Sequence, residues 1–316
     1  MNAISVAIIQ VLAALALAPA ISWFIKKLKA ASQNRVGPTL GQVYFDLIKL
    51  FRKEMVVSET ASWVFHGMPF VLFASTVSAL LLVPLFWGET VMGFSGDAVV
   101  LIYLLALGRF FLALAALDTG TSFGGMGSSR EMFLSSLAEP ALLLSFFALS
   151  FHAKTLSIQA MVSSFGNEPP APMLFFTALI FGAMLIVTLV ESARIPVDNP
   201  ATHLELTMVH EAMVLEYSGR YLAMIEWSHQ IKQLVFFSLL ANLFCPWGIA
   251  AAFDFQQVLL ALAFYLVKLF CVAFLVGWIE IHSAKLRLFR VPDLIAVAFV
   301  LALLSLMGQL MIGRTS

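Results

Sequence analysis

The sequence predicts an all-α integral membrane protein with eight transmembrane helices, and two observations carry this prediction. First, 61% of the 316 residues are hydrophobic and 11% are charged, whereas soluble chains are about 45–50% apolar and about 25% charged. Second, eight apolar runs each approach the roughly 20 residues that cross a bilayer as a helix. The runs cover residues 3–25, 68–87, 98–117, 131–151, 172–190, 232–252, 257–279 and 292–312. Because no repeat or low-complexity linker separates them, residues 1–316 are expected to form a single integral domain.

The charge balance and the two cysteines exclude several classes of function. Eighteen basic residues balance eighteen acidic residues, so no net field attracts nucleic acid. Cys245 and Cys271 lie 26 residues apart in apolar runs, a spacing that suits neither a disulfide framework nor an iron–sulfur motif. The sequence therefore predicts no metal site and no cofactor in this chain, and no nucleic-acid partner.

The basic residues predict how the chain is oriented. Lys26 and Lys27 directly follow the first run, and no basic segment precedes it, so this run is expected to be an anchor rather than a signal peptide. Thirteen Lys and Arg residues fall in odd-numbered connections, but the even-numbered connections and the termini hold only Lys154 and Arg314. The positive-inside rule then predicts a multi-pass protein of the cell inner (cytoplasmic) membrane with both termini outside.

Residues 42–53, after the first run, are expected to form an amphipathic interfacial helix. Val43, Leu47 and Phe51 recur at helical spacing, while Asp46 and Lys49 fill the other face. Gly37-Pro38 ends any helix that continues from the first run. Two interpretations are open: the helix lies on anionic headgroups, or it walls the entrance of a site at the membrane surface.

The connection 191–231 and the end of the seventh run are unusually acidic. Their acidic residues are Glu191, Asp198, Glu205, Glu211, Glu216, Glu226 and Glu280. Such a density requires cations or a protein partner, and it gains little from packing against anionic lipid. His210 and Glu211 begin like the zincin motif HExxH, but Val214 stands where the second histidine is required. No zinc site is therefore predicted, either here or with His203.

Arg109, Glu139 and Lys268 are ionisable residues inside apolar runs. A charge at mid-bilayer costs about 2.5–3.5 kcal/mol, so each is expected to face protein or water. Arg109 and Glu139 each lie eight residues from the cytoplasmic edge, roughly 12 Å deep, and are expected to pair. The pair is either a static salt bridge or part of a titratable relay, and Pro140 would kink the helix there and admit water. Lys268 has no obvious partner at its depth, which favours a proton-handling role.

Three segments on the expected cytoplasmic face resemble a known family. They are Asn34-Arg35-Val36-Gly37-Pro38 with the amphipathic helix, Gly127-Ser128-Ser129-Arg130-Glu131, and Glu191-Ser192-Ala193-Arg194-Ile195-Pro196-Val197-Asp198 running on to Glu216-Tyr217-Ser218-Gly219. Together they resemble the membrane-arm component of respiratory complex I that is designated H, and its counterparts in membrane-bound hydrogenases, such as subunit 4 of formate hydrogenlyase and the hydrogenase-4 membrane component. The resemblance implies an eight-helix heel subunit on which a hydrophilic redox arm docks.

The same resemblance implies partners and roles. The partners would be an iron–sulfur small subunit, a large catalytic subunit and antiporter-like membrane subunits, with iron–sulfur clusters and, in hydrogenases, nickel–iron held by the partners. A proton or coupling path would include Glu131, Glu139, Glu191, Glu205 and Glu216. Lys268 is expected to belong to this path as well, because it lies inside an apolar run. Residues expected at the docking surface or in a cavity are Arg35, Gly37, Arg130, Arg194, Asp198 and Tyr217.

The sequence is compatible with three functions. The favoured one is a non-catalytic subunit of a hydrogenase-type oxidoreductase that couples electron transfer to proton or sodium translocation. The second is the quinone-site subunit of an NADH dehydrogenase, and the third is a free-standing cation or proton transporter. Quinone-reducing members have phenylalanine where this chain has Val197, and they lack Asn199-Pro200 and His203. These departures favour the hydrogenase branch and argue against a quinone pocket.

Overall fold

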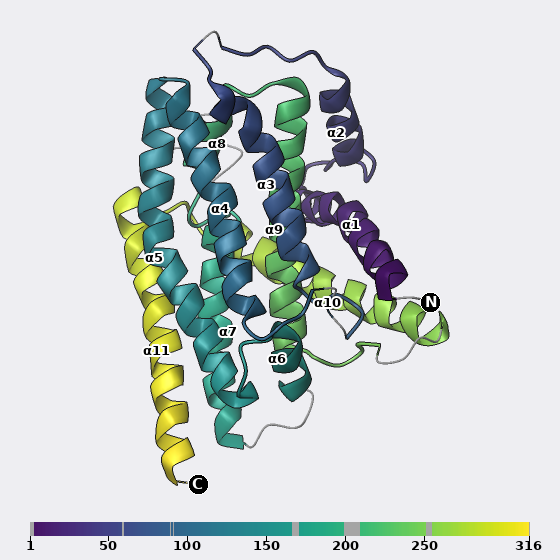
Figure 1. Cartoon of the computed structure of the whole chain (residues 1–316), viewed down its shortest axis with the longest axis vertical. Helices are drawn as coiled ribbons and strands as arrows, with labels where there is room; N and C mark the ends of the chain where they lie inside the picture. Colours follow the sequence, from purple (N-terminus) through teal and green to yellow (C-terminus); the bar gives the residue numbers. More distant parts are fainter. Residues whose placement is uncertain are drawn as a thin grey trace.

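The computed structural model describes residues 3–58, 60–88, 90, 92–165, 171–198, 209–250 and 255–315, which form a bundle of α-helices (Figure 1). The described helices are α1 (Ala3–Ser32), α2 (Gln42–Arg52), α3 (Trp63–Leu81), α4 (Asp97–Asp118), α5 (Ser122–Ala153), α6 (Ile158–Phe165), α7 (Ala171–Glu191), α8 (His210–Val214), α9 (Gly219–Phe244), α10 (Phe255–His282) and α11 (Val291–Thr315). A 3₁₀ turn, Leu288–Arg290, precedes α11.

The predicted all-α membrane architecture is confirmed. Among the described residues, seven helices are long and apolar enough to cross a membrane: α1, α3, α4, α5, α7, α10 and α11. The remaining expected span corresponds to α9, which is 26 residues long but more polar than the others. Figure 1 shows α4, α5 and α11 nearly parallel, whereas α1 and α10 are strongly inclined to them.

The predicted boundaries of the span 232–252 are wrong, because the corresponding helix, α9, begins at Gly219 and ends at Phe244. Its first half carries Arg220, Glu226 and Lys232, which lower its hydropathy below that of a span facing lipid. Helix α9 is instead packed inside the bundle against α1, α2, α3, α7 and α10. Protein groups can therefore pair with its polar side chains, as a lipid environment could not.

Helix α5 also begins earlier than expected, at Ser122 rather than at residue 131. The connection from α4 is only a short turn, in which Gly120 has a φ of +69°. The Thr121 side chain caps α5 by accepting a hydrogen bond from the Gly124 backbone N–H at 3.3 Å. The segment 127–131 is therefore helical, and Gly127 lies so close to α8 that an added Cβ would be 3.0 Å from the Ala212 Cβ. This part of α5 is rich in glycine, which is neither strongly apolar nor typical of helices, so the sequence did not predict it as part of the span.

The connections alternate between two ends of the bundle. At one end, which we call the polar end, Ser62 N donates to the Asp118 carboxylate at 2.7 Å and Val56 N donates to Ser218 Oγ at 2.8 Å. At the other end, the far end, Gly88 N donates to the Ala250 carbonyl at 3.1 Å. The polar end holds the connections expected to be cytoplasmic.

Helix α2 forms as expected and lies against α1 and α9. Val43 and Leu47 are buried, while Phe45 and Ile48 on its outer side are 67% and 47% exposed. The Tyr44 hydroxyl donates to the Ala16 carbonyl at 2.6 Å, which fixes α2 beside α1. Its exposed apolar side chains agree with a helix at the membrane surface.

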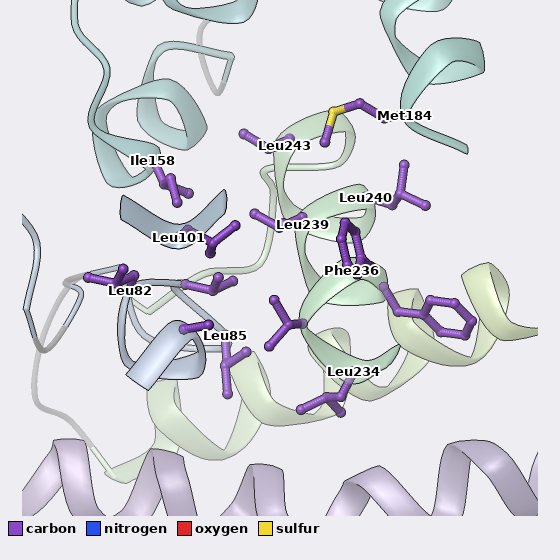
Figure 2. Close-up of a cluster of buried hydrophobic side chains, with 14 of the residues drawn as sticks. Leu82, Leu85, Leu101, Ile158, Met184, Leu234, Phe236, Leu239, Leu240 and Leu243 are labelled. Atoms are coloured by element: carbon purple, nitrogen blue, oxygen red, sulfur yellow. The ribbon is translucent and has the colours of Figure 1, made fainter. Parts of the chain in front are cut away.

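An apolar core fills the bundle toward the far end, around the second half of α9 (Figure 2). Phe236, Phe237 and Leu240 of α9 are each at most 1% exposed. They belong to one cluster with Leu101 of α4 and Met184 of α7. This core anchors α9, and therefore fixes the position of its polar half at the opposite end.

Candidate functional site

A cavity with a volume of about 910 Å³ lies at the polar end. Its walls are α1, the connection after α1, the ends of α7 and α10, α8 and the first half of α9. The ionisable residues that line it are Lys26, Lys29, Arg35, Glu191, Arg194, Asp198, His210, Glu211, Glu226, His229, Lys232 and Glu280. Among the described residues, the apolar ones that line it are aliphatic: Ala30, Val36, Pro38, Ala193, Ile195 and Ile281. A cavity with these walls suits water, ions and protons better than a large apolar ligand.

Glu280 holds one wall of this cavity together. Its carboxylate, fully buried, lies 3.2 Å from Lys29 Nζ and 3.5 Å from Arg194 Nη1. Arg194 also donates to Gln233 Oε1 at 2.9 Å. Residues from α1, α9, α10 and the segment after α7 are therefore tied to one buried carboxylate, and each charge has an opposite partner.

Glu191 begins a second line of charges that leads from the cavity into the bundle. Its carboxylate lies 2.7 Å from Lys232 Nζ and 2.6 Å from Arg109 Nη1. The other terminal nitrogen of Arg109 contacts Glu139. The side chains of Arg109 and Glu191 are 7% and 3% exposed, whereas that of Glu139 is 31% exposed on the outside of the bundle. The line of charges thus connects an inner cavity with an outer face.

The sequence predicted Arg109 beside Glu139 but missed Glu191 as the second partner of Arg109. The structure brings all three side chains together. The pairing was predicted from the depth of residues inside the apolar runs, whereas Glu191 is the last residue of α7, at the polar end. The long reach of the arginine side chain bridges this difference in depth.

A small void adjoins this line of charges. Its volume is about 10 Å³, roughly the space that one water molecule needs. Arg109, Glu131, Ser135 and Glu191 line it, together with Asp198. Glu131 is therefore placed beside the same buried charges as Glu139, two turns nearer the start of α5.

Asp198 holds the start of α8 in place. One carboxylate oxygen accepts hydrogen bonds from the backbone N–H groups of Val209 and His210 at 3.1 and 3.2 Å. The other oxygen lies 2.7 Å from Lys285 Nζ. These contacts position α8 beside the cavity, where Glu211 becomes largely buried. Burial, together with the nearby carboxylates of Glu226 and Asp198, raises the pKa of Glu211 to about 7, while Lys26 opposes the shift.

The other predicted site residues divide into two groups. Arg35, Gly37 and Arg194 line the cavity. Arg130, Glu216 and Tyr217 lie outside its lining: Arg130 contacts Met126 on α5, Glu216 is exposed, and the Tyr217 hydroxyl donates to the Phe65 carbonyl at 3.0 Å in a buried cluster. Glu205 and His203 fall outside the described residues.

Lys268 lies on α10 away from the cavity, and it has polar partners that the sequence did not reveal. Its ammonium donates to Asn242 Oδ1 at 2.9 Å and to the carbonyls of Cys245 and Trp247, both at 3.0 Å. Three donors thus meet three acceptors at the end of α9, where free carbonyls attract a cation. The predicted proton-handling role of Lys268 remains a prediction.

No group of three or more His, Cys, Asp and Glu side chains in the described part of the chain is arranged to hold a metal ion. Within the ranges described, His210 has one neighbouring histidine, His229, rather than the three or four ligands of a zinc centre.

A family model described as NADH dehydrogenase matches residues 4–310 of the chain. The chain belongs to this family. Its cavity and buried charges are therefore features of a membrane protein of the NADH dehydrogenase family, and the resemblance seen in the sequence is confirmed.

Two relatives from Escherichia coli (strain K12) resemble this family member over nearly its full length. Hydrogenase-4 component C is 33% identical over 299 residues, which cover 95% of this chain and 93% of the relative. Formate hydrogenlyase subunit 4 is 31% identical over 303 residues, covering 96% and 97%. An NADH-quinone oxidoreductase component of Syntrophotalea carbinolica, the one designated H, is 27% identical over 281 residues, covering 83% and 81%.

A solved structure supports the fold. A chain of an archaeal respiratory membrane complex, the membrane-bound sulfane sulfur reductase, superposes with a TM-score of 0.81 at 18% identity. The match covers 96% of this family member and 100% of that chain. At this identity the comparison establishes the architecture alone.

Proposed function

We propose that this protein is the membrane heel subunit of a hydrogenase-type, complex I-related oxidoreductase. It anchors a hydrophilic redox arm and couples electron transfer to the translocation of protons or sodium ions. The observation that carries this proposal is the buried line of charges Lys232–Glu191–Arg109–Glu139, which leads from the polar cavity to an outer face. Intramembrane ionisable residues that line such a path are typical of ion and proton translocation.

The hydrogenase branch is supported by the two Escherichia coli relatives at 33% and 31% identity. The composition of the cavity supports the same choice, since its many charges and few aliphatic residues are poorly suited to a quinone and its apolar chain. In this proposal the cofactors, iron–sulfur clusters and a nickel–iron centre, belong to the partner subunits of the arm.

The partner subunits would meet the chain on two sides. The polar end, with the cavity and the exposed Glu216, is the surface proposed to contact the small and large subunits of the arm. Glu139 opens on the outer side of α5, where an antiporter-like membrane subunit would receive the effect of its charge. The positions of these charged groups at the surface of the bundle support both proposed contacts, one with the redox arm and one with a membrane subunit.

The test is Glu139→Gln in the assembled complex. Arg109 keeps its buried partner Glu191 in this variant, so we expect the complex to assemble and redox turnover to continue. Ion movement per turnover should be lost, because glutamine accepts hydrogen bonds but does not titrate. Redox turnover and ion uptake are measured together in sealed vesicles. Asp46→Asn, at an exposed carboxylate of α2, is the matched control, and normal turnover with normal ion uptake in Glu139→Gln would reject the relay.

A further inference from the structure

Two histidines in the cavity wall contact each other. His210 Nε2 of α8 lies 2.7 Å from Nε2 and 3.0 Å from Nδ1 of His229 of α9. The ring centroids are 4.0 Å apart. Either nitrogen of His229 can therefore be the partner, and a small ring rotation exchanges them.

Glu191 is poorly suited to carry protons out of this cavity. Its carboxylate is held between two cations, Lys232 at 2.7 Å and Arg109 at 2.6 Å. Taking up a proton would leave both cations facing a neutral acid in a buried site, which is unfavourable. Glu191 therefore acts as a fixed anion that holds Arg109 in place, and proton transfer requires another group.

The histidine pair stands at the border between the cavity and the interior of the bundle. His210 and His229 line the cavity, while Val209, next to His210, lines the small void that also borders Glu131 and Ser135. On α5, Glu131 and Ser135 precede Glu139 at intervals of four residues, so these three residues follow one face of the helix. Glu131 therefore lies close to the histidine pair, and Ser135 and Glu139 follow it on the same face of α5.

We propose that His229 and His210 form the proton relay between the cavity and Glu131, and that Glu139 receives the proton from there. This inference rests on the proposed function and identifies the two histidines as the groups that carry the proton. A proton from the cavity binds one nitrogen of His229, and His229 gives its other ring proton to His210 Nε2. His210 then releases its Nδ1 proton toward a water in the void, from which it reaches the Glu131 carboxylate. Both rings end neutral, and rotation about the side-chain bonds restores the starting tautomers.

The charges around the pair favour neutral rings that can accept protons. Burial lowers the pKa of His210, and Lys232 acts in the same direction, whereas Glu131, Asp198 and Glu191 act against it. At the cavity side, the pKa of Glu211 is raised to about 7. Glu211 can thus exchange protons with the cavity near neutral pH.

Chemical rescue tests this relay in the assembled complex in sealed vesicles. His229→Ala opens space in the cavity wall that a free imidazole can occupy. We expect ion movement per redox turnover to fall at least about tenfold, since a positioned acid–base group typically contributes 10²–10⁴-fold. Added imidazole should restore a substantial part, whereas pyrazole, similar in size but far less basic, should not. His66→Ala is the matched control, because His66 contacts Tyr221 on the exposed side of α3 and not the cavity.

Three results would overturn the relay: normal ion movement in His229→Ala, no restoration by imidazole, or equal restoration by pyrazole, which would mean that only space filling matters. If His229→Ala does not assemble, His229→Gln takes its place, since the amide keeps a hydrogen bond but carries no proton through the ring. Normal ion movement per turnover in His229→Gln would overturn the relay as well. A wild-type complex that turns over without moving ions would instead overturn the proposed function.

Discussion

The two halves of α9 are both enclosed by protein, but by opposite means. The first half, Gly219–Gln233, places Glu226, His229 and Lys232 in the wall of the charged cavity. The second half, Leu234–Phe244, is surrounded by the apolar core of Figure 2. The first half therefore depends on matched charges and hydrogen bonds, and the second on close packing. One helix thus joins an apolar anchor to the site of buried charges.

This comparison predicts different responses to mutation. In the polar region, removing one member of a pair leaves a buried charge without compensation. In the apolar region, truncation leaves a cavity, whose cost depends on local relaxation. Coupling between mutations should therefore be strong among the charges and weak between the two regions.

The largest effect is expected for Arg109→Met. Glu139 loses its arginine and Glu191 keeps only Lys232, so the free energy of unfolding should fall by about 3–5 kcal/mol. The measurement is unfolding of the purified subunit in detergent micelles with increasing denaturing detergent. A loss below about 1 kcal/mol would show that these charges are not buried together in the folded protein.

A double-mutant cycle sharpens this result. Phe236→Ala, in the apolar half, should also cost about 3–5 kcal/mol, and its effect should add to that of Arg109→Met within about 0.5 kcal/mol. The effects of Glu191→Gln and Arg109→Met should sum to less than full additivity, because either change alone already breaks the pair that they share. Equal additivity in both cycles would contradict the distinction between the two halves.

The second prediction uses pH to probe the polar half. The Glu211 pKa is raised from 4.5 to about 7, so the folded protein favours the protonated carboxyl. Its contribution to stability is full below about pH 4.5 and is lost as the pH rises through about 7. Glu211→Gln removes this dependence, and at pH 8 the variant should be more stable than the wild type by about 1–3 kcal/mol.

Thermal unfolding of both proteins at pH 5 and pH 8 checks this prediction. The stability difference between Glu211→Gln and wild type should increase with pH. Glu216→Gln is the matched control, because Glu216 lies on the same segment but is exposed. A difference that does not change with pH would mean that Glu211 is not buried beside Glu226 and Asp198.

The sequence was sufficient for most of the fold because hydropathy reports what contacts lipid. Seven of the apolar runs correspond to helices that satisfy length and hydropathy. The same reasoning misplaced α9 by more than a turn, since the polar side chains of its first half face protein partners. Hydropathy averages over a helix and carries no information about which side chains are paired.

The candidate site was predicted less completely. Counting residues from the edge of the membrane placed Arg109 and Glu139 at one depth, and the structure puts them in contact. Residue counting could not reveal the contact between His210 and His229, because this contact depends on how α8 packs against α5 and α4 beside α9. The many acidic residues of the connection 191–231 indicated that cations or other partners contact them, but did not identify these partners.

The smallest effect on stability is expected at Glu216, which is exposed at the polar end. Glu216→Lys should change the free energy of unfolding of the isolated subunit by no more than about 0.5 kcal/mol, as surface substitutions generally do. If the polar end docks the redox arm, the same reversal should nevertheless reduce co-purification of the arm with the membrane part, more strongly at low salt, where exposed charges are least screened. Lys154→Glu, an exposed reversal at the far end, should leave co-purification unchanged. Equal recovery of the arm with both variants would remove Glu216 from the docking surface and leave the cavity region as its only proposed part.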